Sequence, residues 1–299
     1  MSGERSFRCG FVALIGRPNV GKSTLLNQLV GQKVSIMAPK PQTTRHRILG
    51  IKNLPDAQII YVDTPGLHRK AKRALNRYLN RAAIAAIRDV DVIVWVIEPQ
   101  ELKGDDRLVY QQLQEVSKPV ILAINKVDKL KDKRELLPLI DRLRAKFDFA
   151  AIVPISALKG VQLEALEEEI KKHLPEGPML YSEGQVTDKT ERFQAAEIVR
   201  EKLIHLLREE IPHQLAVTVE RWEEEGDLVR IDATIWVERE SQKPIVIGQG
   251  GQLLKRVGSL ARRELEQLLG KRVFLALWVK VKEKWSDREQ LLRKLGYAD

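Results

Sequence analysis

The stretch Gly16-Arg17-Pro18-Asn19-Val20-Gly21-Lys22-Ser23 decides the fold of the first half of the chain, because it matches the phosphate-binding pattern G-x-x-x-x-G-K-[ST]. An apolar strand pattern, 11–15, precedes it, and a helical pattern, 24–30, follows it. In this context the glycines let backbone N–H groups close around phosphates, while the helix N-terminus adds positive potential. The motif therefore predicts a nucleoside-triphosphate site.

Further side chains are expected to complete this site around Mg²⁺. Lys22 should contact the β- and γ-phosphates, and Ser23 should ligate the metal ion. The stretch 63–66, Asp-Thr-Pro-Gly, follows another apolar strand pattern and matches the D-x-x-G switch of GTPases. Asp63 should hold Mg²⁺ through water, and the Gly66 N–H should sense the γ-phosphate.

A second switch is expected at 42–45, Gln-Thr-Thr-Arg, between the P-loop helix and the next strand. One threonine should close over Mg²⁺; we prefer Thr44, and Thr43 is the alternative. The expected metal ligands are therefore Ser23, Thr44 and Asp63. The residues expected to act in catalysis are Asn19, Lys22, Thr44 and Gly66.

The stretch Asn125-Lys126-Val127-Asp128 indicates which base is bound. Asp128 is placed to accept hydrogen bonds from the N1–H and 2-amino groups of guanine, a donor pair that adenine lacks. Asn125 should brace the loop, the Lys126 stem should cover the base, and the Ala157 N–H can donate to guanine O6. The sequence thus predicts GTP and GDP as ligands. The residues expected to bind nucleotide are Gly16, Asn19, Val20, Gly21, Lys22, Ser23, Thr24, Asp63, Thr64, Pro65, Gly66, Leu67, Asn125, Lys126, Asp128, Ser156, Ala157 and Leu158.

Leu67 stands where Ras-like enzymes carry a glutamine that orients the attacking water. Leucine does not perform that role, so we expect slow intrinsic turnover and another source of positive charge in the transition state. Our hypothesis is a bound K⁺ ion, partly ligated by Asn19; the alternative is that Asn19 only shapes the loop.

The pattern of elements predicts two domains. Residues 7–174 alternate Val- and Ile-rich strand patterns with helical ones, which indicates a mostly parallel sheet with helices on both faces. Pro175-Glu176-Gly177-Pro178 interrupts this pattern, and the order that follows is helix, strand, strand, helix, strand. We predict an α/β P-loop NTPase domain at 1–176, a linker at 177–190, and a smaller α+β domain at 191–299.

The second domain carries the core pattern of a KH module, at 246–254, with its G-x-x-G loop at 248–251. Such a loop lets a nucleic-acid backbone approach closely, and KH modules clamp about four nucleotides of a single strand. Basic residues follow in the next helix and line the last strand. Trp236 and Trp278 can stack on bases, although strand aromatics more often cover a core. The residues expected to bind RNA are Ile247, Gly248, Gln249, Gly250, Gly251, Lys255, Arg256 and Lys280.

Composition limits the remaining possibilities. The 299 residues carry a formal net charge of +10, which favours a polyanionic partner. The single cysteine, Cys9, excludes an internal disulfide framework and a Cys-based zinc knuckle. No apolar run approaches the roughly 20 residues of a membrane-spanning helix, and the first nine residues contain no apolar signal core, so we expect a cytoplasmic protein.

Together these stretches resemble the Era family of bacterial GTPases, over nearly the whole chain. The run Gln-Thr-Thr-Arg-His-Arg at 42–47 and the C-terminal KH domain discriminate best, with support from Glu-Ile-Pro-His-Gln at 210–214. Der-type GTPases have two P-loop domains, and this chain has one. Tetrahydrofolate-using tRNA-modification GTPases end in a Cys-containing motif, which this chain lacks.

The resemblance implies a type II KH domain that binds the single-stranded 3′ end of 16S rRNA, and a role in assembling the 30S subunit and maturing its rRNA. It also implies peripheral association on the cytoplasmic face of the inner membrane. We expect a monomer. Two alternatives stay open: a membrane-surface signalling GTPase, and a non-hydrolysing RNA-binding protein that holds nucleotide as a structural element.

Overall fold

The computed structural model describes residues 6–40, 42–67, 73–102, 104–207 and 211–297. The described ranges therefore leave out residues 68–72, Glu210 of the 210–214 motif, and the start of the N-terminal stretch 1–9. The chain forms two compact units. The first comprises Met1–Ser35, Thr44–Ala71 and Tyr78–Asp188, and the second comprises Ile36–Thr43, Lys72–Arg77 and Lys189–Asp299.

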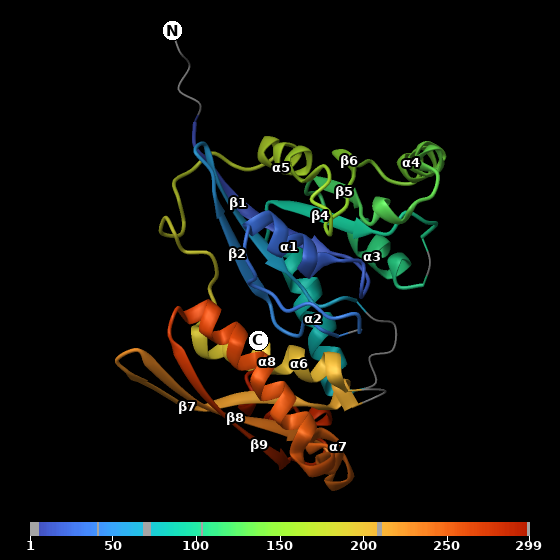
Figure 1. Cartoon of the computed structure of the whole chain (residues 1–299). Helices are drawn as coiled ribbons and strands as arrows, with labels where there is room; N and C mark the ends of the chain where they lie inside the picture. The colour runs from blue at the N-terminus through green and yellow to red at the C-terminus, as the bar shows by residue number, and fades with distance from the viewer. Residues whose placement is uncertain (1–5, 41, 68–72, 103, 208–210, 298–299) are drawn as a thin grey trace. The chain divides into compact units, whose positions relative to one another are not determined.

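The first unit is built on a six-stranded sheet in the order β2-β3-β1-β4-β5-β6 (Figure 1). Every neighbouring pair is parallel except β2 and β3, which confirms the mostly parallel sheet. The central strands are almost wholly buried and rich in Val and Ile, as expected for strands covered on both faces. Their bounds are β1 Arg8–Ile15, β2 Ile48–Asn53, β3 Ala57–Asp63, β4 Val92–Ile97, β5 Val120–Ile124 and β6 Ala151–Pro154.

Five helices cover this sheet. On one face α2, α3 and α4 bury Ala83, Val109 and Leu139 against strand residues such as Trp95. On the other face α1 contacts β1, β2 and β3, while α5 contacts β5 and β6. The bounds are α1 Lys22–Val30, α2 Ala74–Arg88, α3 Asp106–Leu113, α4 Leu136–Arg144 and α5 Leu163–Lys172. The sandwich places the carboxyl ends of the parallel strands at one edge of the sheet, where ligands of such folds bind.

The antiparallel strand β2 is an element that the sequence pattern did not indicate. Gly50 is central to it, because a Cβ there would lie 2.5 Å from the Leu26 Cδ1 of α1. The stretch after Pro178 runs along the free edge of β2: the Ile51 N–H donates to the Val186 carbonyl at 2.9 Å, and the Leu49 N–H donates to Asp188 at 3.0 Å. Glycine interrupts the strand pattern, and the element is explained by its pairing with β3 and its packing against α1.

The second unit contains a three-stranded sheet, β7-β8-β9, with α6 and α8 on the same side of it (Figure 1). β7 and β8 are antiparallel, and β8 and β9 are parallel. The core lies between strand residues such as Val229 and Ile231 and helix residues such as Val199 and Ala261. The bounds are α6 Glu191–Leu206, β7 Ala216–Glu225, β8 Leu228–Val237, α7 Lys243–Ile247, α8 Gln252–Leu269, β9 Arg272–Val281 and α9 Glu289–Lys294. The short helices α7 and α9 were not expected from the sequence.

Residues Ile36–Thr43, which end with the first two residues of the expected switch at 42–45, belong to the second unit, where they contact α6. The Met37 N–H donates to Glu201 Oε1 at 2.9 Å, and the Met37 carbonyl lies 2.8 Å from His205 Nε2. Arg200, fully buried, donates to the Thr43 carbonyl. The boundary between the units therefore falls between Thr43 and Thr44 in the chain.

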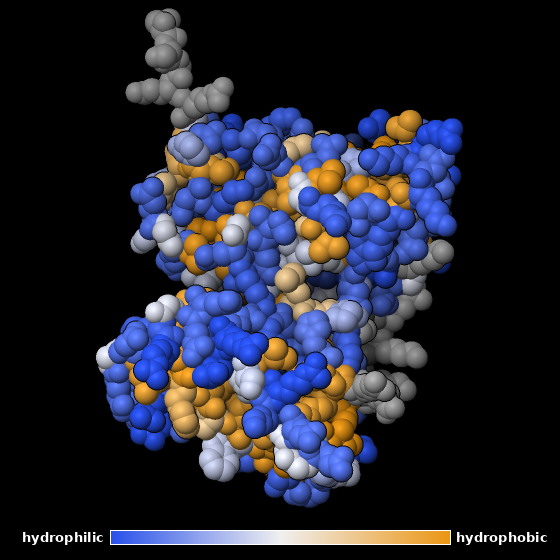
Figure 2. Space-filling view, in the orientation of Figure 1, coloured by the Kyte–Doolittle hydropathy of each residue, from blue (hydrophilic) through white to orange (hydrophobic). Residues whose placement is uncertain are grey.

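In the view of Figure 2, hydrophilic residues dominate the visible surface, and hydrophobic residues are scattered among them. Of the helices in the described ranges, none is both long and apolar enough to cross a membrane.

Candidate functional site

The phosphate-binding loop follows β1 directly and ends where α1 begins at Lys22. Gly16 and Gly21 have φ values of 153° and 102°. A Cβ on Gly16 would lie 2.4 Å from the Val96 carbonyl oxygen, and one on Gly21 would lie 2.4 Å from Asn125 Nδ2. Only glycine therefore fits these positions. Val20 is buried, and Asn19 adopts a left-handed φ of 63°.

Lys22 lies almost completely buried under this loop. Its Nζ donates to the carbonyls of Gly16 and Arg17, each at 3.0 Å. Burial is the main reason that its pKa falls to about 8, and the nearby Asp63 carboxylate partly offsets that fall. An anion bound in the loop would stabilise the protonated amine, so this lysine is arranged to receive phosphate.

A cluster of hydroxyl groups surrounds the buried carboxylate of Asp63. Ser23 and Ser35 donate to Asp63 Oδ2 at 2.8 and 2.9 Å, and Thr44 donates to it at 3.3 Å. Ser23 and Thr44 also hydrogen-bond to each other at 2.8 Å. Burial raises the pKa of Asp63, although Lys22 and these hydroxyls oppose the rise.

The two threonines of the second switch differ in their surroundings. Thr44 is buried beside Ser23 and Asp63, whereas the Thr43 hydroxyl donates to the Lys40 carbonyl at 2.7 Å. Thr44 is therefore the threonine that this structure brings to the Asp63 cluster. Sequence reasoning missed Ser35, and the only signal for it was its proximity to the switch.

The 63–66 stretch lies beside the phosphate-binding loop. A Cβ on Gly66 would lie 2.7 Å from the Pro18 backbone nitrogen, so the two loops are in close contact. The Thr64 hydroxyl donates to the Leu14 carbonyl at 3.0 Å and ties the stretch to β1. Leu67 is buried and hydrophobic and packs in the core of the first unit.

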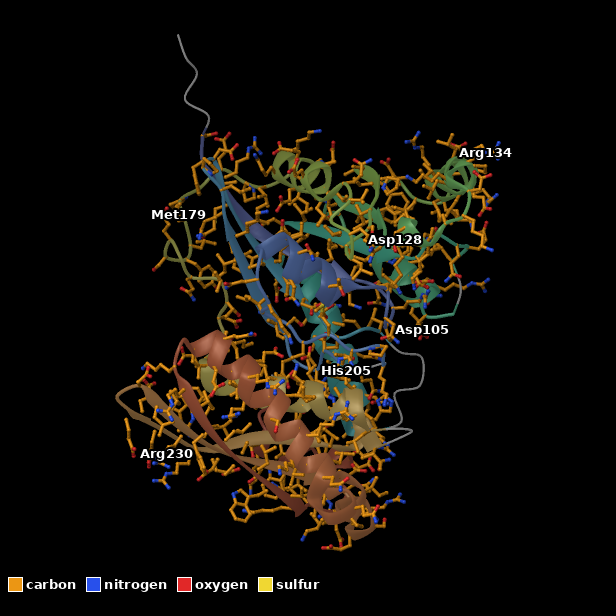
Figure 3. The ribbon with its side chains drawn as sticks, in the orientation of Figure 1. Asp105, Asp128, Arg134, Met179, His205 and Arg230 are labelled. Atoms are coloured by element: carbon orange, nitrogen blue, oxygen red, sulfur yellow. The ribbon has the colours of Figure 1, made fainter. Side chains whose placement is uncertain are left out.

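The expected base site forms where β5 and β6 end. The Asn125 side chain joins three loops: its Nδ2 donates to the Val20 carbonyl at 2.8 Å, and its Oδ1 accepts from the N–H groups of Lys126 and Ala157 at 2.8 and 2.9 Å. The Ser156 hydroxyl donates to Asp128 Oδ1 at 2.5 Å, which orients the carboxylate (Asp128 is labelled in Figure 3). Leu158 is 66% exposed, so it offers apolar surface to a ligand at this edge.

An ion-pair network that the sequence did not indicate connects the two loops. Glu98, at the end of β4, pairs with Arg17 of the phosphate-binding loop and with Lys126 of the base loop. Lys126 also donates to the Asn19 carbonyl at 2.6 Å. These cations lower the pKa of Glu98 despite its partial burial. The network aligns the phosphate and base regions, and its carboxylate comes from a residue outside every motif.

The G-x-x-G loop of the second unit connects α7 to α8. Gly248, Gly250 and Gly251 all have left-handed φ values, of 76°, 56° and 77°. A Cβ on Gly248 would lie 2.6 Å from the Leu253 Cβ, whereas Cβ atoms on Gly250 and Gly251 would meet open space. The loop therefore offers bare backbone at the N-terminus of an 18-residue helix. Ile247 ends α7, half-buried, and Gln249 is exposed.

The first turns of α8 carry the basic side chains expected beside this loop. Lys255 and Arg256 are both exposed. A shallow pocket of about 370 Å³ lies along the helix and is lined by Gln252, Lys255, Arg256, Ser259, Leu260 and Arg263. Lys280 is exposed on β9.

Known families match both units. Residues 11–126 match the family described as 50S ribosome-binding GTPase, and residues 210–286 match the KH domain family. A protein of Coxiella burnetii named GTPase Era is 55% identical over 97% of this chain and 98% of its own length. One of Pseudomonas putida with the same name is 50% identical over the full length of both chains.

Two solved structures resemble this one over 98% of the chain, each with a TM-score of 0.95 and 45% sequence identity. One is a variant of Aquifex aeolicus Era bound to GDP and AlF₄⁻. The other is Era in complex with MgGDPNP and nucleotides 1506–1542 of 16S ribosomal RNA. The match covers all of each solved chain and includes both units.

Proposed function

Since this chain belongs to the Era family and is a GTPase, we propose that it couples GTP hydrolysis to binding of 16S rRNA by its KH domain during assembly of the 30S subunit. The observation that carries the proposal is that one chain joins a phosphate and guanine site to an open G-x-x-G loop before a basic helix. A relative with the same two units binds a 16S rRNA fragment.

In this proposal the nucleotide lies across the carboxyl edge of the first unit's sheet. Lys22 and the backbone of the phosphate-binding loop bind the β- and γ-phosphates, and Gly66 senses the γ-phosphate. Asp128 accepts the N1–H and 2-amino protons of guanine, and the Ala157 N–H faces O6. Asn125 joins the two regions, because its side chain already bonds to both loops.

The Asp63 cluster fits Mg²⁺. Among the described atoms, Asp63 Oδ1 is buried and has no hydrogen-bond partner, and hydroxyls of Ser23 and Thr44 lie beside the same carboxylate. Such oxygen ligands, together with nucleotide phosphates, are what Mg²⁺ prefers. Ser23, Thr44 and Asp63 would hold the ion, which would neutralise charge that develops on the phosphates.

Leu67 does not orient the attacking water, so another group must stabilise the transition state. We propose that a K⁺ ion ligated by Asn19 supplies positive charge to the transition state of hydrolysis. The left-handed backbone of Asn19 and its contact with Lys126 fix the loop at this point. Hydrolysis in potassium and in sodium, at equal ionic strength, provides the test. Equal rates would remove K⁺ from the mechanism.

We also propose that the protein is a cytoplasmic monomer, with a peripheral fraction on the cytoplasmic face of the inner membrane. The support is family membership and the net charge of +10, which suits anionic surfaces. Cell fractionation with a salt wash tests the membrane fraction, since peripheral binding by charge is lost as salt increases.

The main test compares RNA binding by loop variants. Gly250→Asp and Gly251→Asp add negative charge where a Cβ meets open space, and aspartate tolerates the left-handed conformation better than most residues. Gln267→Asp adds the same charge near the far end of α8 as a control. We expect the loop variants to lose binding to the 16S fragment of nucleotides 1506–1542 and to keep GDP binding. Unchanged RNA affinity would refute the KH assignment.

A further inference from the structure

In the described part of the chain, one face of the second unit's sheet carries exposed side chains. The helices α6, α7 and α8 contact β7 and β9, and the buried side chains of Val229, Ile231 and Val273 face them. Side chains alternate along a strand, so the residues between these point to the opposite face. Figure 3 shows Arg230 of β8 on the side of the sheet away from α6 and α8.

Aromatic side chains gather on this open face. Trp278 of β9 is 60% exposed and Phe274 is 51% exposed, which are high values for such large rings. Trp236 of β8 is half-buried, and its Nε1 donates to the Thr218 hydroxyl at 2.8 Å, which holds its ring in place. In the parallel register Thr234 pairs with Trp278, and Trp236 pairs with Lys280, so the two tryptophans are diagonal neighbours.

Cations are placed among these rings. Lys280 Nζ and Lys282 Nζ lie 5.9 and 4.8 Å from the centre of the Trp236 ring, and Arg230 lies 5.6 Å from the centre of Phe274. We define Trp236, Phe274, Trp278, Lys280 and Lys282 as the aromatic face.

Acidic groups concentrate at the other end of the open sheet. Near the β7–β8 turn, Glu223 pairs with Arg221 at 2.5 Å, and Glu225 pairs with Arg230 at 3.2 Å. Towards the tryptophans, Glu220 of β7 accepts from the Thr218 hydroxyl at 2.6 Å, and Asp232 of β8 pairs in register with Ala276, between Phe274 and Trp278. The tryptophan end therefore combines two lysines with exposed ring surface and suits an anionic partner that has flat apolar faces.

We propose that the aromatic face binds single-stranded RNA, with a base stacked on Trp278 and phosphates near Lys280 and Lys282. This inference rests on the proposed RNA-binding function and adds a surface outside the G-x-x-G loop. Unpaired RNA presents both groups that the face fits, because its bases are free to stack on aromatic rings and its backbone is anionic.

The position of β9 connects the two surfaces. Among the described strands β9 pairs only with β8, so it forms an edge of the sheet. The helices on either side of the G-x-x-G loop, α7 and α8, both contact β9. A single strand of RNA held by the G-x-x-G loop can therefore pass the edge of the sheet at β9 and continue onto the aromatic face. This path lengthens the bound RNA segment by several nucleotides.

The test combines a stacking variant with RNA probes of two lengths. Trp278→Ala removes the exposed ring, and Leu268→Ala removes an exposed apolar side chain of α8 as a matched control. The long probe is the 16S fragment of nucleotides 1506–1542. The short probe is chosen from a set of shorter pieces of it, as the shortest piece that the wild-type protein still binds. Loss of one stacked base weakens binding roughly 5- to 100-fold. We expect this loss for the long fragment, little change for the short piece, and wild-type behaviour for the control.

Two further measurements separate stacking from a structural effect. Trp278→Phe keeps a ring and should recover most of the affinity, and the quenching of tryptophan fluorescence on binding RNA should be smaller in this variant. A Lys280→Gln and Lys282→Gln double variant should reduce the slope of log affinity against log salt. Thermal unfolding of every variant should match that of the wild type, because these side chains are at the surface.

Each remaining outcome has a definite meaning. If Trp278→Ala binds both probes normally while Gly250→Asp abolishes binding, the aromatic face is not an RNA surface and the KH function stands. If wild type binds neither probe, the proposed function fails and this inference fails with it. If Trp278→Ala loses only binding to vesicles of equal parts phosphatidylglycerol and phosphatidylcholine, the face is a lipid surface and the inference is wrong.

Discussion

We propose that the choice of guanine depends on a single residue, Asp128. Its carboxylate is oriented by the Ser156 hydroxyl at 2.5 Å, at the end of a loop that Asn125 holds in place. An oriented carboxylate accepts two protons from guanine, and each hydrogen bond to a charged group contributes about 1.5–3 kcal/mol. In this proposal the selectivity of the site is a property of one side chain and its immediate support.

Asp128→Asn should lower GDP affinity by roughly 100-fold or more, because an amide oxygen replaces one acceptor and an N–H now faces the guanine donors. The same variant should gain affinity for xanthosine diphosphate, whose 2-oxo group accepts from the new N–H. Titration with labelled nucleotides measures both. The control is Asp132→Asn, the same change at an exposed carboxylate that pairs with Arg134. GDP affinity equal to that of wild type would count against the assignment.

Lys22 predicts a pH effect on nucleotide binding. Its pKa of about 8 in the free protein means that it is about half protonated at pH 8, and phosphate should restore full protonation. Binding of preformed MgGDP at pH 8 should therefore take up roughly half a proton, and binding at pH 6.5 should take up almost none. Calorimetry in two buffers of different ionisation enthalpy measures this uptake. Release of protons at pH 8, or no proton exchange at that pH, would contradict the prediction that Lys22 is buried with a lowered pKa and faces the phosphates.

At the scale of elements, the contact between β2 and α1 depends on Gly50. A Cβ there would lie 2.5 Å from Leu26 Cδ1 and 2.8 Å from Val30 Cγ2, and Leu26 is fully buried. The β2 edge also carries the 186–188 stretch, so this glycine supports the last part of the first unit.

Gly50→Ala should destabilise the first unit by about 1–3 kcal/mol, the usual cost of overpacking a tight core. Gly177→Ala is the control, since a Cβ there meets nothing within 4 Å and the backbone is not left-handed. Denaturant unfolding followed by circular dichroism compares the two. If both variants had the same free energy of unfolding, α1 and β2 could move apart without loss of stability, and the prediction would be wrong.

At the scale of the whole molecule, the chain itself joins the two units within the switch. Thr43 belongs to the second unit, whereas Thr44 belongs to the first and lies beside Asp63. Thr44 is joined directly to the segment 36–43, whose residue Met37 is hydrogen-bonded to Glu201 and His205 of α6. A movement of Thr44 towards a metal ion would therefore pull on this segment. A ligand shifts such an equilibrium only through different contacts in its two states. We propose that the hydrogen bonds between Met37 and α6 differ between those states.

His205→Ala and Glu201→Ala should reduce the difference in RNA affinity between the GDPNP-bound and GDP-bound protein, because each removes a hydrogen bond to Met37. Arg192→Ala, which removes a bond to the Glu220 carbonyl from the same helix, is the control. Fluorescence anisotropy with the 16S fragment measures both states. If the wild-type protein binds RNA equally well with GDPNP and with GDP, the proposal that the nucleotide controls RNA affinity is wrong.

The motifs predicted much of the first unit because they are local. A P-loop needs glycines at fixed positions. Asp63 is the last residue of the buried strand β3, and Asp128 follows the buried strand β5. Parallel strands bring their carboxyl ends to one edge, so the order of elements in the sequence was enough to place these groups together. The order predicted for the second unit, helix, strand, strand, helix, strand, is found as α6, β7, β8, α8 and β9, with the short helices α7 and α9 in addition.

The sequence by itself determined which backbone loops form and which chemistry each one carries, since those depend on residues a few positions apart. Only the tertiary structure decided the partners that lie far apart in the chain: Ser35 beside Asp63, Glu98 between Arg17 and Lys126, and Met37 on α6. Ser35, Glu98 and Met37 belong to no motif. Their positions follow from how the elements pack, and packing depends on the whole core rather than on neighbours in sequence.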